Sequence, residues 1–210
     1  MEKAKLVRNT LGHLHTVHKH RKYVRKYCFK CGLYKRGLLH DLSKYSPTEL
    51  FESIKYYTGD QSPLEISKKK NRYSKAWFHH KGRNDHHYQY WVDNFDHGGT
   101  PIKMSFEAAT EMICDSLAAS RVYNGKDFSY KLALKYVVDK LKDKRMLMHD
   151  HTKIYMLEVF TSLYRMEDED IIRRFFKRKS LKKMYDEIDL EYDIDYFDAL
   201  IKKLCKELEI

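Results

Sequence analysis

Apolar side chains at helical spacing run through the N-terminal part of the chain without a break. Steps of three and four place these residues on one face, so the pattern predicts a single long helix from near Lys3 to Cys31. His20 lies on this stripe between two valines and is predicted to be buried, whereas His15 and His18 lie off it and are predicted to face solvent. A buried imidazole needs a polar partner, which makes His20 a candidate functional residue. The stripe consists of His13, Val17, His20, Val24, Tyr27 or Cys28, and Cys31.

Helical spacing also dominates the rest of the chain, which contains only 8 glycines and 3 prolines. There are no alternating runs typical of strands and no internal repeats, so the sequence predicts an all-α protein. Ser46-Pro47-Thr48-Glu49 has the pattern of a capping box with proline in the first helical position, and Ser105 is a further predicted cap. The predicted helices span about 47–59, 63–80 with a break near 71, 105–124, 129–142, 150–164 and 171–210.

The charged stretch 167–170 is interpreted as a boundary. It divides the chain into a metal-binding helical domain, residues 1–166, and a charged helical C-terminal extension, residues 167–210. The last helix carries an apolar stripe that predicts packing against the domain; a partner-binding or dimerising helix is the alternative, and the oligomeric state stays open. The stripe consists of Phe197, Leu200, Ile201, Leu204 and Leu208.

The formal net charge is +11, and a surface of this kind attracts phosphates, nucleic acid or anionic membranes. Because the positive charge is dispersed, we interpret it as support for an anionic substrate. No apolar run is long enough to span a bilayer and the N-terminus lacks a signal-peptide core, so we expect a cytoplasmic protein without a membrane partner. Cys28 and Cys31 form a lone CxxC, interpreted as small buried helix residues, while Cys114 and Cys205 stand alone.

Two adjacent histidine pairs, His79-His80 and His86-His87, flank a short stretch of turn residues. Gly82 can end one helix, and Asn84 or Asp85 can cap the next. Such a corner would bring several imidazoles within reach of one point, and imidazole is the commonest metal ligand in proteins. The alternative is a histidine-rich aromatic surface loop. Which member of each pair points inward is left open.

His40-Asp41 and Asp115 add acids to this set. Asp115 lies in a small apolar stretch, where a carboxylate needs a cation such as a metal, Arg121 or a lysine. Nitrogen and carboxylate ligands suit one or two ions of Mn, Fe, Co, Ni or Zn and argue against a structural zinc site. The candidate metal ligands are His20, His40, Asp41, His79, His80, His86, His87 and Asp115.

The order of these residues resembles the HD-domain superfamily of metal-dependent phosphohydrolases. HDLSK, residues 40–44, is similar to one form of the superfamily's histidine-aspartate doublet, and the two later pairs are similar to the extra histidines of members that hold two metals. HDLSKYSP, AWFHHKGRN and EMICDSLAAS also resemble a bacterial family of unknown function. The resemblance spans about His13 to Leu163. It departs at Ser116, where we expect arginine, and at Gln89, where we expect an acid.

The resemblance implies an HD-domain-like helical bundle and hydrolysis of a small phosphate ester, a nucleotide being one candidate, by metal-activated water. Lys44, Lys81 and Arg83 are then expected to hold the phosphate. Asp41, Lys44 and Glu111 are expected to carry catalysis, with Glu111 either accepting a proton or supporting the ligands. His149 and His151 are interpreted as the start of a helix.

Two other functions stay open. A basic, aromatic-rich chain could bind nucleic acid, with binding that falls steeply with salt and is insensitive to chelation. A metal-binding scaffold without catalytic activity is the other alternative.

Overall fold

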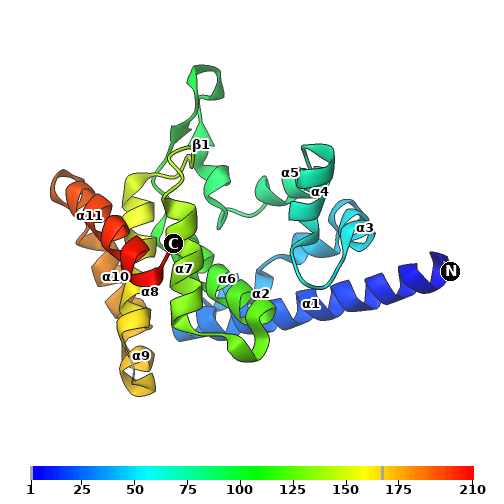
Figure 1. Ribbon diagram of the computed structural model, residues 1–210, viewed down its shortest axis with the longest axis horizontal. Helices are drawn as coiled ribbons and strands as arrows, with labels where there is room; N and C mark the ends of the chain where they lie inside the picture. The colour runs from blue at the N-terminus through cyan, green and yellow to red at the C-terminus, as the bar shows by residue number, and fades with distance from the viewer. Residues whose placement is uncertain (1, 167) are drawn as a thin grey trace.

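The computed structural model describes residues 2–166 and 168–210, and within these ranges the protein is a bundle of α-helices with one very small sheet (Figure 1). The prediction of an all-α protein is therefore confirmed. The α-helices are α1 (Glu2–Lys30), α2 (Tyr34–Leu39), α3 (Pro47–Tyr56), α4 (Pro63–Asn71), α5 (Lys75–Lys81), α6 (Phe106–Asn124), α7 (Tyr130–Leu141), α8 (Asp150–Arg165), α9 (Glu169–Phe175), α10 (Arg178–Asp186) and α11 (Leu190–Leu208). Short 3₁₀ turns are η1 (Leu42–Tyr45), η2 (Tyr88–Trp91), η3 (Phe95–His97) and η4 (Gly125–Asp127).

The predicted first helix is confirmed, and it packs along α6. Its N-terminal part extends beyond the body of the molecule, at the right of Figure 1. The buried face has the predicted stripe, including His20, while His15 and His18 face solvent. Gly32, with φ of 70°, ends the helix and turns the chain back into α2. A Cβ on Gly37 would lie 2.8 Å from the Cβ of Cys28, so only glycine allows α2 to approach α1 this closely.

A second group of helices, α3 to α5, lies over the N-terminal half of α1. Ser46 caps α3 by accepting a hydrogen bond from the backbone N–H of Glu49, 3.4 Å away. Pro47 occupies the first turn, as predicted. Ser74 caps α5 in the same way through the N–H of Trp77. The helix predicted over 63–80 is divided into α4 and α5, with the break close to the predicted position at Asn71.

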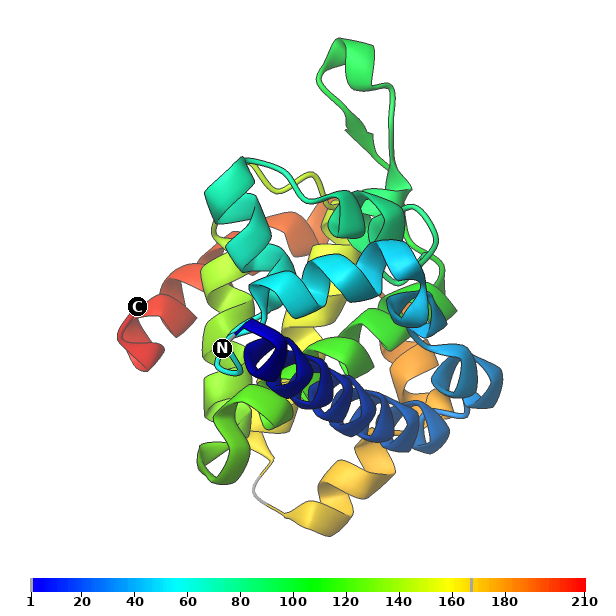
Figure 2. The same cartoon turned by 90° about the vertical axis from the view of Figure 1, so that its right-hand side faces the viewer.

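The only sheet in the described part of the chain is a hairpin of two short strands, β1 (Val92–Asp93) and β2 (Thr100–Pro101). Val92 pairs with Pro101 and Asp93 with Thr100 in antiparallel register. The hairpin extends away from the helices in both views (Figures 1 and 2). Sequence analysis found no strand pattern here, because two-residue strands are too short to show alternation.

The C-terminal helices share the main hydrophobic core. The predicted stripe of α11 is buried, and together with Ile172 and Leu181 it belongs to the same cluster as residues of α6, α7 and α8. Packing of this stripe against the domain is confirmed. Residue 167, at the expected boundary, lies outside the described residues, and the division at 166/167 stays a prediction.

Three of the four cysteines are buried, and Cys205 is partly exposed. Cys28 and Cys31 are fully buried and free, as predicted, and the Sγ atoms of Cys31 and Cys114 lie 3.9 Å apart. Sequence analysis did not place Cys114 beside the CxxC. Cys31 directly follows α1 and Cys114 lies on α6, so their contact depends on how these two helices pack. None of the described helices combines the length and apolar character needed to cross a bilayer.

Candidate metal centre

The doublet lies in a tight turn between α2 and η1. His40 follows the last residue of α2, and Asp41 adopts a left-handed backbone with φ of 54° and ψ of 30°. Aspartate is one of the few residues other than glycine that adopt this conformation readily. The turn directs both side chains inward, where His40 and Asp41 are 2% and 1% exposed.

The first possible metal-binding group combines the doublet with the helix pair α1 and α6. The Nε2 atom of His20 lies 2.8 Å from Oδ1 of Asp115, and Nε2 of His40 lies 3.5 Å from the same oxygen. Nε2 of His40 is also 3.2 Å from Oδ2 of Asp41. One nitrogen or oxygen atom from each residue of the group lies within 4.8 Å of the others. This group consists of His20, His40, Asp41 and Asp115.

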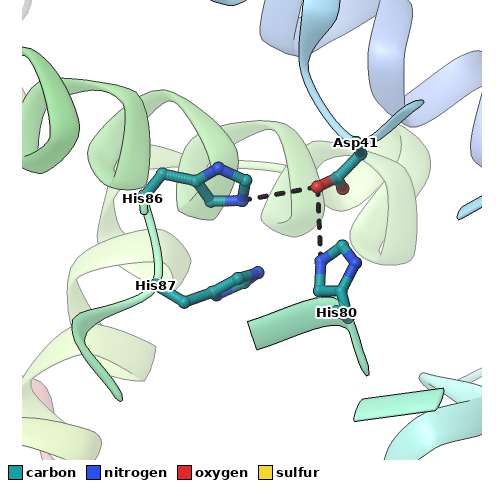
Figure 3. A group of neighbouring side chains, drawn as sticks. All are labelled: Asp41, His80, His86 and His87. Atoms are coloured by element: carbon teal, nitrogen blue, oxygen red, sulfur yellow. Dashed lines mark ion pairs between the residues drawn. The ribbon is translucent and has the colours of Figure 1, made fainter. Parts of the chain in front are cut away.

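The second group uses the other carboxylate oxygen of Asp41 (Figure 3). Oδ1 lies 3.3 Å from Nε2 of His80, on α5, and 3.4 Å from Nε2 of His86. His87 follows directly, and its ring points toward the same space in Figure 3. The group consists of Asp41, His80, His86 and His87, so Asp41 belongs to both groups. The predicted corner thus brings three of its four histidines together.

Five of the ligand-type atoms in the two groups are buried without a hydrogen-bond partner. Four ring nitrogens and one carboxylate oxygen have no hydrogen-bond partner, although several lie close together. Ligands about 2.1 Å from a common ion lie roughly 3.0–3.4 Å from each other, which is the spacing seen here. Buried polar groups without partners are rare in proteins, so these residues fit a bound cation well. The unpaired atoms are Nε2 of His20, His40, His86 and His87, and Oδ1 of Asp41.

The protonation of His87 agrees with this fit. Burial, with His86 and His80 adding to it, holds the pKa of His87 well below its ordinary value, so this ring is neutral, the form that binds metals. For His80, burial is the largest single influence and lowers the pKa, but the charge of Asp41 and the hydrogen bonds to Asp41 and Glu49 together raise it above its ordinary value. A cation at the same place would displace that proton.

Glu111 supports the ligands from the opposite side of their rings. Its Oε1 lies 2.8 Å from Nδ1 of His40 and 3.3 Å from Nδ1 of His86, which leaves both Nε2 atoms facing the candidate site. Arg36, which sequence analysis did not identify, donates from Nε to Oε2 of Glu111 at 2.6 Å and also pairs with Asp85. Burial alone would raise the pKa of Glu111, but the hydrogen bonds from the two histidines lower it to about 2. Such a carboxylate is a weak base, so the geometry favours the supporting role over the proton acceptor.

Glu49 has the same role on the other side, and sequence analysis assigned it only to a capping box. Its two oxygens lie 2.6 Å from Nδ1 of His79 and 2.8 Å from Nδ1 of His80. The side chain therefore orients His80 and does not reach back to Ser46, so only half of the capping box forms. A third possible group is formed by His40, His86 and Glu111. His79, a candidate ligand in the sequence, lies outside all three groups that could hold an ion. Adjacent residues of a helix project about 100° apart, and of these two rings only that of His80 lies beside Asp41.

Lys44 is the cation closest to the two groups. Its Nζ lies 2.6 Å from Oδ2 of Asp41; burial lowers the pKa of Lys44, but Asp41 outweighs burial and raises it, so the amine stays charged. Lys81 and Arg83, the other expected phosphate contacts, do not line the cavity beside the site. Arg83 is exposed, and its guanidinium donates to the carbonyl of His79. Arg121, an alternative partner for Asp115, instead donates to the hydroxyl of Tyr27.

A cavity of about 280 Å³ opens directly onto the candidate site. His20, Asp41, His80, His87 and Asp115 all form part of its wall. Ser116 and Gln89, the two departures from the expected pattern, also line it. His149 and His151 lie elsewhere: His149 caps α8 through the N–H of His151, as the sequence predicted.

The fold and the site define an all-α protein with a buried histidine and aspartate cluster that could hold a metal ion. The profile described as "Family of unknown function (DUF5662)" matches residues 9–132, and the chain belongs to this family. The match includes every candidate ligand, but it ends before the expected limit near Leu163. No curated protein and no solved structure matches the chain significantly.

Proposed function

We propose that this protein is a metal-dependent phosphohydrolase of the HD type, which adds water across the ester bond of a phosphate monoester to give phosphate and an alcohol. The observation that carries the proposal is Asp41, whose two carboxylate oxygens face two adjacent groups of ligand-type residues with five buried atoms that lack a hydrogen-bond partner. Shared carboxylates of this kind are typical of sites that hold two ions. The cavity beside them provides room for a substrate.

The donor set suits one or two ions of Mn, Fe, Co, Ni or Zn. When bound, such an ion polarises a phosphoryl oxygen and makes water more acidic. The protein's own residues would do the rest. His20, His40, Asp41 and Asp115 would hold one position, and His80, His86 and His87 the other together with Asp41. Glu49 and Glu111 fix the rings, and Lys44, charged and facing the cavity, would neutralise one phosphate charge.

The test is elemental analysis of the purified protein combined with a panel of phosphomonoesters that includes nucleotides. We expect a transition metal in the wild-type protein and hydrolysis of some member of the panel. His40→Ala should abolish both, whereas Lys81→Ala, outside the cavity, should leave both intact. Metal without turnover across a broad panel would instead favour a non-catalytic metal-binding scaffold.

Nucleic-acid binding is the second candidate, favoured by α1. Among its described side chains this helix exposes basic residues along much of its length, including Arg8, Lys22, Arg25, Lys26 and Lys30. Binding to a duplex or single strand should weaken steeply with salt and persist in a chelator. Salt-sensitive binding by a protein that contains no metal would replace the hydrolase proposal.

The four free cysteines fit the reducing cytoplasm, where we propose the protein acts.

A further inference from the structure

The cavity extends from the candidate metal centre along one face of α6. Asp115 lies at the metal end of this face, and Ser116, Ala119 and Val122 follow within two turns; all four line the cavity. Residues at these spacings share a side of a helix. Because serine and alanine are small, the space next to the ligands stays open, and side chains of leucine size at these positions would fill it.

The inner wall of the cavity is apolar. Val137 and Leu141 come from α7, Met156 from α8, and Met148 from the segment between these helices; all four are buried. Met112, one turn before Ser116 on α6, continues this wall. A ligand group that enters this part of the cavity therefore contacts methyl, methylene and thioether groups.

Among the described residues of the cavity wall, acids outnumber cations: Glu49 and the exposed Glu65 line it as well as Asp41 and Asp115. Among the described residues that line the cavity, the cations are Lys44 and Lys140. Lys44 is paired with Asp41 beside the ligands, and Lys140 is exposed, with its Nζ 4.5 Å from the centre of the Tyr136 ring. A chain of two or three phosphates carries more negative charge than this wall can neutralise.

The cavity wall also contains polar side chains outside the ligand groups, among them Gln89 and His13. Oε1 of Gln89 and Nδ1 of His13 are buried without partners, and both residues line the cavity. Burial, with Lys44 adding to it, lowers the pKa of His13 to about 4, so this ring is neutral near pH 7. These two atoms can form hydrogen bonds with the organic part of a ligand, and neither carries a positive charge that would hold a second anionic group.

We propose that the substrate is the phosphate monoester of a compact, uncharged and largely apolar alcohol or phenol. The phosphate lies at the metal centre beside Lys44, and the organic group lies along α6 against the apolar wall. The cavity of about 280 Å³ limits this group to a small molecule. The inference rests on the proposed phosphohydrolase function and adds the class of substrate.

The test uses alkylphosphonates, which resist hydrolysis, from methyl to hexyl, together with inorganic phosphate. Each is titrated into the metal-loaded protein by calorimetry. Burial of one methylene group increases affinity about three- to fourfold, so the dissociation constant should fall by this factor at each carbon until the cavity is full. Methylenediphosphonate, which carries a second charged phosphonate, should bind more weakly than butylphosphonate.

Ala119→Leu is the main variant, because it narrows the cavity without touching a ligand. It should raise the dissociation constant for hexylphosphonate at least tenfold and change that for methylphosphonate by less than twofold. Ala199→Leu makes the same change on the exposed face of α11 and should alter neither of the two dissociation constants. Ser116→Leu is the second variant, should Ala119→Leu fail to fold.

The outcomes separate the two proposals. Binding of phosphate with no gain along the alkyl series, or tighter binding of the diphosphonate, overturns the substrate class and leaves the hydrolase proposal standing. A protein that holds metal but binds neither phosphate nor any phosphonate overturns both.

Discussion

Glu111 and His40 form a buried contact in which Oε1 lies 2.8 Å from Nδ1, on the edge of the ring opposite the candidate metal site. The contact fixes which ring nitrogen carries the proton and leaves Nε2 free for an ion. Neutralising such an outer carboxylate typically lowers metal affinity 10- to 100-fold.

We therefore expect Glu111→Gln to weaken metal binding by about 10- to 100-fold, measured by competition with a chromogenic chelator. Glu107→Gln is the matched control, one turn earlier on α6, where the side chain pairs with Arg178 at the surface. Equal affinities for the two variants would mean that Glu111 does not position the ligands.

The neighbours His79 and His80 provide a second comparison. Both donate to Glu49, but only the ring of His80 faces Asp41. His80→Gln should lower metal affinity at least tenfold, whereas His79→Gln should change it by less than about threefold, because only a supporting contact is lost. Elemental analysis after dialysis against limiting chelator gives the comparison. The opposite order would assign the ligand to His79.

Removing the ion should destabilise the fold, because it leaves buried ligand atoms unpaired. An ion present at about 100 times its dissociation constant stabilises a protein by roughly 2.7 kcal/mol. For a chain of this size that corresponds to a rise in Tm of about 5–10 °C. Thermal unfolding with a chelator, and then with excess Mn, Fe, Co, Ni or Zn, measures this change in Tm. A Tm that responds to none of the five metals argues against the site.

The lowered pKa of His151 predicts that the protein loses stability in acid. Burial, with Lys103 adding to it, lowers the pKa of His151 to about 4, below the ordinary value of 6.5. Between these two values the unfolded chain binds a proton that the folded protein does not, so stability falls as the pH drops from 6.5 toward 4. This one group contributes a slope of up to about 1.4 kcal/mol per pH unit.

His151→Phe should flatten this slope while keeping an aromatic ring against Tyr185, which packs edge-on with ring centres 4.4 Å apart. Urea unfolding of both proteins at several pH values between 4 and 7 gives the comparison. Parallel curves for wild type and variant would show that the proton is taken up elsewhere.

A substitution at Leu204 tests whether the C-terminal extension unfolds together with the rest of the protein. The side chain is completely buried in the core shared with α7 and α8. Leu204→Ala should therefore lower the free energy of unfolding by about 2–5 kcal/mol in one cooperative transition. Metal affinity should not change. Two separate transitions would instead mean that the extension unfolds on its own.

The fold could be predicted to the extent that it depends on local patterns. The spacing around His20 placed that ring on the buried face of α1, and Ser105 capped α6 as expected. Asp115 was expected to need a cation because of its apolar neighbours, and the structure places its Oδ1 2.8 Å from Nε2 of His20, in a group that could hold one. Each of these inferences concerns a single element, where periodicity and capping chemistry determine the outcome.

The contacts between helices were harder to predict from the sequence. Glu49 in a capping-box position predicts a bond to its own helix, yet tertiary packing places it between two histidines of α5. Arg36 carries no local signal at all, because its partners lie 49 and 75 residues away. The choice between His79 and His80 depends on the rotation of a seven-residue helix, which the sequence of that helix does not determine.

The left-handed backbone of Asp41 affects how the evolution of this protein can be traced. Asparagine and glycine also tolerate such a conformation, whereas most other residues are strained there by about 1–2 kcal/mol. Folding alone thus restricts position 41 to a few residues, with or without an ion. A descendant that had abandoned its chemistry could still retain this acid, and the change would be seen first in the histidines around it.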